Sequence, residues 1–202
     1  MTDGAFTGQI AVVNFISIDG VIQSPLSPDE DRDGGFEHGG WVPSYSDDTI
    51  NAFMQDATIG AAGMLLGRRS YEILSDAWSD ADASEPAVAA MNRMPKYVVS
   101  SSLEDLGWQN SRVITGDMAS AITDIKNRTA GDLVVFGSGT LVRGLAEHDL
   151  VDEYRLLLFP IVLGAGKRMF DERGHLARFN LTDSVVTSSG VVLLTYTRDK
   201  SA

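Results

Sequence analysis

The 202-residue chain contains no cysteine, which excludes disulfides, thiolate nucleophiles, zinc–thiolate sites and iron–sulfur ligation. It has only three histidines, and His38, His148 and His175 show no metal-ligand spacing. Lysine and arginine together number 16 against 28 acidic residues, which gives a formal charge of -12. Because nucleic-acid binders concentrate basic side chains, this balance argues against a nucleic acid as partner.

Long apolar runs are absent as well. No segment reaches the roughly 18 apolar residues that a membrane-spanning helix needs, and the opening MTDGAFTGQ lacks the basic and apolar regions of a signal peptide. We therefore expect a cytoplasmic protein with no membrane partner. Hydrophobic residues make up 44% of the chain and charged residues 22%, as in globular proteins with a buried core. At this length we expect a single domain, residues 1–202.

Short apolar segments alternate with amphipathic segments along most of the chain. The expected strands lie within residues 9–22, 64–67, 96–103, 111–115, 132–136, 152–164, 179–188 and 190–198. The expected helices lie within residues 49–63, 68–74, 84–94, 116–128 and 140–148. Strands separated by helices favour an α/β fold with a mainly parallel sheet of about eight strands and helices on both faces. The last two strands predict an antiparallel C-terminal hairpin that turns near Ser189 and Gly190.

A long loop interrupts this alternation. Residues 23–48 are rich in proline, glycine, serine and aspartate and have no hydrophobic period. Loops of this length are either functional lids or disordered. Phe36, Trp41 and Tyr45 favour a packed lid, because purely solvated segments contain few aromatic rings. Ser46, Asp47 and Asp48 are the possible N-caps of the helix that follows.

Two strands lead through glycine directly into a helix, in VVFGSGTL (134–141) and in MLLGRRSYE (64–72). Such a junction exposes unpaired backbone N–H groups at the positive end of a helix dipole, and this arrangement suits an anion. The alternative is that Gly137 and Gly139 only permit a tight turn. A third strand ends in three serines at 100–102.

Because carboxyl ends of parallel strands gather at one edge of a sheet, these three elements could converge on one ligand with two or more phosphates. Arg68 or Arg69 could pair with phosphate, and Ser100 or Ser101 could hydrogen-bond to it. The alternative for the two arginines is a solvated surface pair.

Standard nucleotide motifs are not present. A dinucleotide fingerprint needs a third glycine where Val142 stands, which excludes the usual Rossmann signature. In LGAGKRMF (163–170), Arg168 stands where a P-loop needs serine or threonine, so we interpret the segment as a glycine turn at a strand end. No G-x-S-x-G nucleophile elbow occurs, which weakens a hydrolase interpretation.

The segments MLLGRRSYE, PKYVVSSSL and LVVFGSGTLVRGLAEHDLVDEYRLLLFPIVLGAGKRMF resemble the dihydrofolate reductase-like superfamily. The resemblance is strongest to the branch that contains the C-terminal reductase domain of the bifunctional riboflavin biosynthesis protein, and it extends from FISIDGVI to the terminal hairpin. It implies a three-layer fold with NADPH along the sheet edge, a small-molecule substrate and a homodimer.

The resemblance also implies which residues hold the cofactor. The positions that match the family's cofactor-binding junctions are Gly67, Arg68, Arg69, Ser70, Ser100, Ser101, Gly137, Ser138, Gly139, Thr140 and Leu141. Residues 67–70 would contact cofactor phosphates, and Ser100 and Ser101 would contact the adenosine-phosphate end. Residues 137–141 would contact the pyrophosphate and the nicotinamide. The arginines and serines would favour NADPH over NADH.

The substrate side departs from the relatives. Folate-reducing members place a carboxylate about five residues after a tryptophan, whereas WVPSYSDD has Ser46 at that offset and Asp48 beyond it. Asp19 matches a position near the expected nicotinamide, so Asp19 and Asp48 are the catalytic candidates. The alternatives are a turn-forming aspartate at 19 and a helix N-cap at 48. Trp41 and Tyr45 could stack on a flat heterocycle.

The sequence therefore predicts an NADPH-dependent reductase that delivers hydride to a C=N, C=C or C=O bond of a small ring-containing substrate. The proton would come from an acidic side chain or a bound water. One alternative is a stand-alone 5-amino-6-(5-phosphoribosylamino)uracil reductase of riboflavin biosynthesis, since a chain without cysteine lacks the zinc deaminase half. The other is a noncatalytic nucleotide-binding module.

Overall fold

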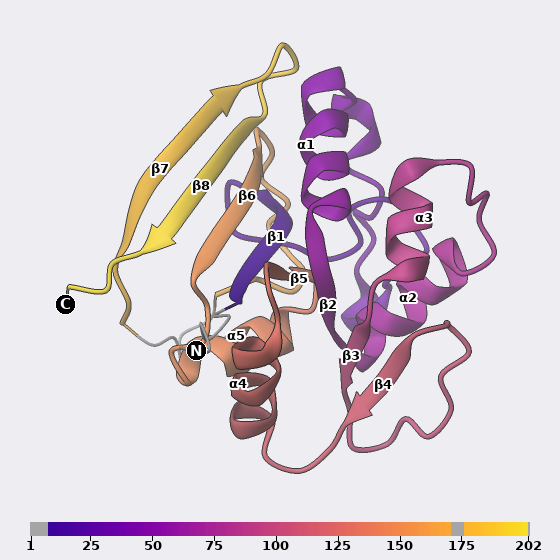
Figure 1. Ribbon diagram of the computed structural model, residues 1–202. Helices are drawn as coiled ribbons and strands as arrows, with labels where there is room; N and C mark the ends of the chain where they lie inside the picture. The colour runs from indigo at the N-terminus through magenta and orange to yellow at the C-terminus, as the bar shows by residue number, and fades with distance from the viewer. Residues whose placement is uncertain (1–7, 171–175, 202) are drawn as a thin grey trace.

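The computed structural model describes residues 8–170 and 176–201. Within these ranges one eight-stranded sheet runs through the molecule in the order β4-β3-β2-β5-β1-β6-β8-β7 (Figure 1). The strands are β1 Gln9–Ser17, β2 Ala61–Gly67, β3 Lys96–Val99, β4 Ser111–Ile114, β5 Asp132–Phe136, β6 Glu153–Phe159, β7 Phe179–Val186 and β8 Val192–Arg198. Neighbours from β4 to β6 pair in parallel, whereas β8 pairs antiparallel with both β6 and β7. The predicted fold class is confirmed, including the antiparallel hairpin that turns at residues 188–190.

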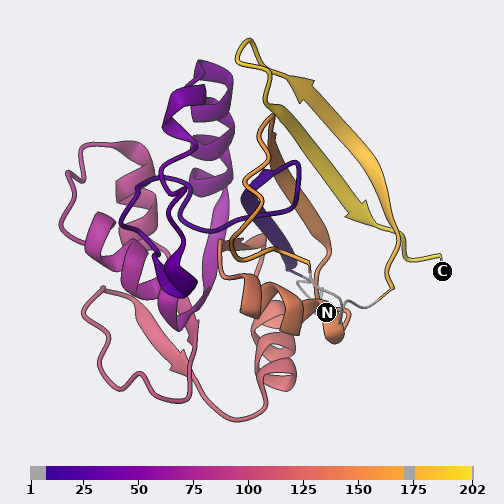
Figure 2. The same cartoon turned by 180° about the vertical axis from the view of Figure 1, so that it is seen from behind.

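Five α-helices cover the two faces of the sheet in the described part of the chain. They are α1 Asp48–Ile59, α2 Arg68–Trp78, α3 Pro86–Arg93, α4 Met118–Arg128 and α5 Gly139–Glu147. Figures 1 and 2 show α1, α2 and α3 together on one face and α4 with α5 on the other. Within the described ranges, no helix combines the length and the apolar character needed to cross a membrane.

Alternation along the strands produces two separate cores. On β2, Met64 and Leu66 point into the core beneath α1, α2 and α3, whereas Leu65 points into the core beneath α4 and α5. All three side chains are fully buried, as expected for a central strand between two helical layers. Trp108, in the loop before β4, completes the first core, and its backbone N–H donates to the Tyr71 hydroxyl at 2.9 Å.

The boundaries of some elements differ from the sequence expectation. The first helix ends at Ile59 with Gly60 as its C-cap, and does not extend to Gly63, because Ala61 and Gly63 belong to β2 and pair with β5. The first strand ends at Ser17, where the chain turns through Gly20 at a φ of 82°. The strand expected at 152–164 stops before Pro160, which cannot donate to the ladder. The two strand ends lie at the carboxyl edge of the sheet, whereas the helix ends at the opposite edge, where β2 begins.

Candidate functional site

The two glycine junctions contact each other directly. Gly67 closes β2 and Gly137 follows β5, the neighbouring parallel strand. The Gly67 N–H donates to the Ser138 hydroxyl at 3.0 Å, and a Cβ on Gly67 would lie only 2.3 Å from that oxygen. Ser138 adopts the left-handed conformation, with φ 61° and ψ 58°. The predicted convergence of the two turns is therefore present, and the close approach explains why residue 67 is glycine.

The helices that follow these turns have no side chain capping their N-termini. By contrast, Asp47 caps α1 and Asp117 caps α4 through their carboxylates, and α3 begins with Pro86, which has no N–H at that position. For α2 and α5 the N-cap residues Gly67 and Ser138 make no side-chain capping bond. Two uncapped helix starts side by side offer N–H groups and positive dipole ends, which fits the phosphates of a dinucleotide.

The Asn14 side chain is hydrogen-bonded to the turn after β5. It lies in the middle of β1, is 5% exposed, and its Oδ1 accepts the Gly137 N–H at 2.8 Å. Its Nδ2 is buried and has no hydrogen-bond partner in the described part of the chain. A buried amide in an otherwise apolar strand is unusual, so the asparagine in AVVNFIS was a signal that sequence reasoning missed.

Gly139 and Ser70 also lie at the contact between the two glycine junctions. A Cβ on Gly139 would lie 3.0 Å from the Ile22 side chain, and one on Gly137 would lie 3.5 Å from the Ser70 hydroxyl. Thr140 accepts a hydrogen bond from Arg143 at 3.3 Å. Leu141 is 5% exposed and packs into the core under α5, so only its backbone can face the sheet edge.

The adjacent arginines of α2 point to different parts of the edge. Arg68 forms an ion pair with Glu72 at 2.7 Å and donates to the Ser102 hydroxyl at 2.8 Å. Arg69 reaches the opposite way, to a carboxylate oxygen of Asp31 at 3.4 Å. Arg68 therefore contacts the serine segment after β3, and Arg69 contacts the loop after β1.

The serine segment is folded by its own hydroxyl groups. The Ser100 Oγ accepts the N–H groups of Ser102 at 3.2 Å and Leu103 at 3.0 Å, which turns the chain away from β3. Ser101 is exposed beside it. Ser102, which the sequence-based choice of two serines left out, is the hydroxyl that contacts Arg68.

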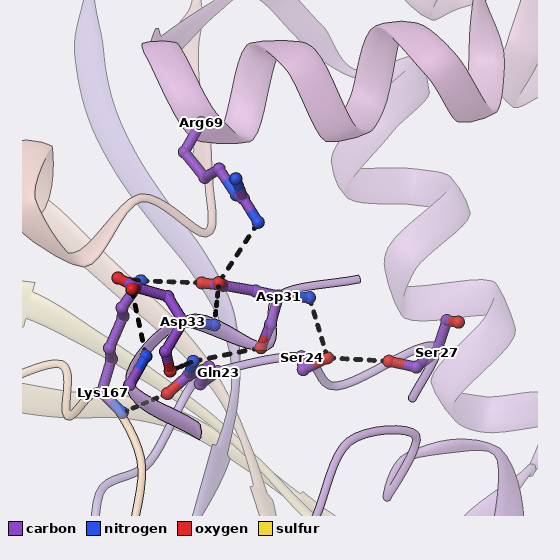
Figure 3. Close-up of polar contacts among 8 residues, drawn as sticks. Gln23, Ser24, Ser27, Asp31, Asp33, Arg69 and Lys167 are labelled. Carbon is purple, nitrogen blue, oxygen red and sulfur yellow. Dashed lines mark hydrogen bonds and ion pairs between the residues drawn. The ribbon is translucent and has the colours of Figure 1, made fainter. Parts of the chain in front are cut away.

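The loop at 23–48 is a packed segment that crosses the sheet edge, and we call it the lid. Gln23 donates to the carbonyls of Asp31 at 3.1 Å and Asp33 at 3.0 Å, and accepts the Lys167 N–H at 2.8 Å (Figure 3). The Asp31 carboxylate meets the Lys167 ammonium at 2.9 Å as well as Arg69. It thus ties the lid both to α2, after β2, and to the loop after β6.

Strands β5 and β1 lie between β2 and β6 in the sheet. The two ion pairs of Asp31 therefore span the part of the sheet edge that contains the turn at Gly137. Asp31 is 8% exposed, and its role was not visible in the sequence, where it stands in a run of solvent-compatible residues. Lys167 belongs to the segment expected to be a glycine turn. Positive φ angles at Gly164 and Gly166 confirm that turn.

A cavity of about 340 Å³ lies between the lid and this glycine turn. Its lining residues are Gln23, Asp33, Gly34, Gly35, Phe36, Glu37, His38, Ala165, Gly166 and Lys167. The cavity is large enough for a small-molecule ring system. Hydrogen bonding to Lys167 lowers the pKa of Asp33. Burial alone would lower the pKa of Lys167, but hydrogen bonds to Asp33 and Asp31 outweigh it and raise that pKa.

The aromatic residues expected to stack on a substrate are part of the core. Trp41 is 5% exposed, its Nε1 donates to the Gln23 carbonyl at 3.0 Å, and its ring meets Phe159 edge-on at 5.2 Å. Tyr45 packs on the same Phe159 ring at 5.6 Å and is half-buried. In this conformation the two rings anchor the lid to the end of β6, and neither lines the cavity.

Asp19 is held at the centre of a hydrogen-bond cluster. Its carboxylate accepts from the Ser17 hydroxyl at 2.7 Å and from the N–H groups of Leu163 at 3.1 Å and Gly164 at 2.9 Å. The Ser17 bond is the main cause that lowers the pKa of Asp19 to about 2, since burial opposes it and the two amides add to it. Asp19 therefore fastens the turn after β1 to the loop after β6 as an anion.

Asp48 lies at the other end of the lid. It is exposed as the first residue of α1. Of the three possible N-caps in the sequence, Asp47 is the one that caps the helix, so the N-cap alternative for Asp48 is not the one the structure shows. Asp47 accepts the Thr49 N–H at 2.8 Å and the Ser188 hydroxyl at 2.5 Å. These bonds, with Ser188 first, lower the pKa of Asp47 to about 2. The structure thus places Asp48 beside a cap that touches the β7–β8 turn, outside the cavity lining.

No group of three or more acidic or histidine side chains with metal-binding geometry occurs in residues 8–170 and 176–201. The family model of the RibD C-terminal domain matches residues 9–193. The chain belongs to this family.

Among individual proteins, the uncharacterized protein YyaP of Bacillus subtilis (strain 168) is 26% identical over 140 residues, which span 66% of this chain and 72% of YyaP. A solved structure from Shewanella sp. PV-4, described as a riboflavin biosynthesis protein, superposes with a TM-score of 0.68 at 20% identity, covering 95% of this chain and 99% of that one. Dihydrofolate reductase from Enterococcus faecalis, complexed with NADP(H), superposes with a TM-score of 0.62 at 15% identity, covering 97% and 99%. At these identities the solved structures show a shared fold, and the family membership supports a reductase.

Proposed function

We propose that this protein is an NADPH-dependent reductase that transfers hydride to a C=N, C=C or C=O bond of a small, ring-containing substrate. The observation that carries the proposal is the contact between two uncapped helix starts, made by the Gly67 N–H and the Ser138 hydroxyl. Membership in the RibD C-terminal domain family supports the same activity. Dihydrofolate reductase of the same fold was solved with NADP(H).

The residues at the two turns fit the cofactor. The first-turn N–H groups of α2 and α5 would bind the phosphates, with Ser70 beside Gly137 between them. Asn14 fixes the Gly137 turn, so that these donors are oriented before the ligand arrives. Bound NADPH supplies the hydride. The lid, fastened by Asp31 across the sheet edge, would exclude water from the reacting atoms.

Arg68 and the serine segment after β3 are the groups that would distinguish NADPH from NADH. The guanidinium sits 2.8 Å from the Ser102 hydroxyl, and its second partner, Glu72, lies on the same exposed helix face. A phosphate ester can replace that carboxylate as the acceptor for arginine. We therefore propose that Arg68, with Ser100 and Ser101 nearby, binds the additional phosphate that NADPH carries and NADH lacks.

Two alternatives have support in particular observations. The family of the riboflavin reductase domain favours a stand-alone 5-amino-6-(5-phosphoribosylamino)uracil reductase. Two observations favour a noncatalytic nucleotide-binding module. The lowered pKa of Asp19 makes it a poor proton donor, and Trp41 is packed in the core instead of facing a substrate. We also propose a homodimer. The cytoplasmic location stays a prediction from the sequence.

Calorimetric titration with NADPH, NADH and NADP⁺ tests the cofactor. We expect micromolar binding of NADPH to wild type and loss of binding in Gly139→Val, because a Cβ at this position already approaches Ile22 to 3.0 Å. Gly107→Ala is the matched control, since a Cβ at Gly107 meets nothing within 4 Å. A folded wild-type protein that binds none of the three nucleotides would overturn the reductase.

Oxidation of NADPH then separates the reductase from its alternatives. We would follow loss of NADPH absorbance with a panel of pterins, pyrimidines and other heterocycles. Turnover of 5-amino-6-(5-phosphoribosylamino)uracil above all others would favour the riboflavin alternative. Tight nucleotide binding without turnover of any acceptor would favour the noncatalytic module.

A further inference from the structure

His38 lies on a packed stretch of the lid and lines the cavity. On one side, the buried Phe36 ring meets the His38 ring edge-on at 5.9 Å. On the other, a Cβ on Gly39 would lie 2.8 Å from the Pro28 backbone, and the Gly40 N–H donates to the Ser24 carbonyl at 2.8 Å. The imidazole is exposed, yet the backbone that presents it is packed on both sides.

The cavity adjoins the turn where the resemblance places the nicotinamide. It is enclosed by the loops after β1 and β6, and β1 pairs with β5, the strand that leads into that turn. Ile22 lies against Gly139, and the Ile22 N–H donates to the carbonyl of Lys167 at 3.0 Å. Lys167 lines the cavity. Lys167, which lines the cavity, is therefore connected to Gly139 in the turn after β5 through a single residue, Ile22.

The charged groups around His38 restrict which one can deliver a proton. Among the described residues, the other titratable side chains that line the cavity are Asp33, Glu37 and Lys167. The ion pair between Asp33 and Lys167, 2.8 Å long, holds the first as an anion and the second as a cation. Glu37 is an exposed carboxylate. Histidine is the side chain whose unperturbed pKa allows it to hold and release a proton at neutral pH.

We propose that His38 is the proton donor of the reduction, an assignment that rests on the reductase function proposed above. The hydride from NADPH forms a C–H bond at the carbon of the substrate's double bond, and NADPH leaves as NADP⁺. The electron pair of the broken π bond moves to the partner atom, which takes the proton from the imidazolium of His38. Because the ring is exposed, solvent returns the proton for the next cycle.

A nuclear magnetic resonance titration tests the placement without a substrate. Protein labelled with ¹³C at histidine Cε1 would be titrated with acid in its NADPH and NADP⁺ complexes, and His38→Asn would assign the His38 signal. The oxidised nicotinamide carries a positive charge, which disfavours a nearby imidazolium. We expect the His38 titration midpoint to lie lower with NADP⁺ than with NADPH, while that of His148, at the far end of α5, stays the same.

Steady-state kinetics with the pterin or pyrimidine that is turned over fastest test the role. In wild type, kcat should fall as pH rises through the imidazole titration. In His38→Asn this limb should be lost and kcat reduced by about 100-fold, the usual range for general acid catalysis. The Kd for NADPH should stay within about twofold, and His148→Asn should behave as wild type.

Equal His38 midpoints in the two nucleotide complexes would overturn the proposal even if no acceptor is found. So would a pH limb that persists in His38→Asn, or one that disappears in Glu37→Gln instead. If wild type binds neither nucleotide, the reductase function itself fails, and the calorimetric result shows this independently of His38.

Discussion

At the scale of single residues, the divergence of Arg68 and Arg69 separates two functions that the sequence placed side by side. Arg68 contacts the serine segment, and Arg69 contacts the lid through Asp31. We expect Arg68→Ala to weaken NADPH binding by about 10- to 100-fold, the usual range for a lost charge-assisted hydrogen bond, and to leave NADH binding nearly unchanged. Calorimetry with both nucleotides measures the difference.

The control for this variant is Arg128→Ala, an exposed arginine that contacts a carbonyl at the end of α4, in the opposite layer. Equal losses for NADPH and NADH in Arg68→Ala would show that the arginine does not read the additional phosphate. The proposed specificity would then be wrong, although the cofactor site itself would stand.

The sequence predicted the backbone turns of the site better than its side-chain roles. Gly137 has a positive φ, which is a local backbone requirement, and both Gly67 and Gly137 stand at the predicted junctions. Side chains such as Asp31 or Asn14 gain their roles from partners far away in sequence, at Lys167 and Gly137 respectively. No local pattern contains that information. For the same reason the sequence could not show that Trp41, a candidate for stacking on a substrate, packs on Phe159.

Lys96 is a buried titratable residue that supports the fold away from the site. Its side chain is inaccessible to solvent, and its ammonium donates to the carbonyls of Met94 at 2.9 Å and Gln109 at 3.0 Å. It also lies 4.6 Å from the centre of the Trp108 ring. Burial lowers the pKa of Lys96 to about 8 from the 10.5 of a free lysine.

Lys96→Met should destabilise the protein by about 2 kcal/mol or more, because the carbonyls lose their donor. The destabilisation should grow with pH between about 8 and 10.5. In that window the unfolded chain still binds a proton that the folded wild type has released, so raising the pH stabilises the folded wild type relative to the unfolded one. Methionine has no such linkage.

Urea unfolding of both proteins across this pH range measures the effect. Lys200→Met, at a side chain that is 74% exposed, is the control and should show no such trend. A constant difference in unfolding free energy between wild type and Lys96→Met would show that Lys96 titrates normally.

At the scale of elements, one carboxylate links the lid to both α2 and the loop after β6. Asp31 binds Lys167 at 2.9 Å and Arg69 at 3.4 Å, and the second contact is the weaker because Arg69 is 60% exposed. Asp31→Asn keeps the size of the side chain but removes its charge. We expect the lid amides to exchange with deuterium about 5- to 30-fold faster, which corresponds to the loss of about 1–2 kcal/mol in local stability.

Asp29→Asn is the matched control on the same lid. Asp29 pairs with Arg32 at 2.5 Å, but both side chains are more than two-thirds exposed, at 77% and 68%, so this pair should contribute little. Mass spectrometry of peptides from residues 23–48 gives the exchange rates. Exchange that is as slow in Asp31→Asn as in wild type would show that Trp41 and Gln23 hold the lid without the carboxylate.

Elements with a clear hydrophobic period were predicted well, and their ends less well. Helix α4 begins after its Asp117 cap and ends at Arg128, where the sequence indicated. By contrast, α1 was extended to Gly63, because Ala61 and Ala62 suit a helix as well as a strand. Residues 61–63 are part of the strand because Gly63 pairs with Leu133 of β5. Such long-range pairing cannot be read from local propensity.

At the scale of the whole molecule, the sheet has one outer strand that carries apolar side chains to solvent. Within the described residues strand β7 pairs with β8 alone, and Leu181, Val185 and Val186 are 52%, 40% and 74% exposed. The other end of the sheet, β4, is four residues long, whereas β7 has eight. A long, apolar edge strand is a site where another chain can add to the sheet.

We therefore expect the proposed homodimer to form at β7, with the two copies related by a twofold axis. Sedimentation equilibrium should give twice the chain mass of 21.7 kDa. Leu181→Asp combined with Val186→Asp should restore the single-chain mass, because two buried carboxylates in each copy would face one another without partners. Ile59→Asp, at the 43% exposed end of α1, is the control and should stay dimeric. A single-chain mass for wild type would exclude the dimer, and a dimer that survives the double substitution would place its interface elsewhere on the molecule.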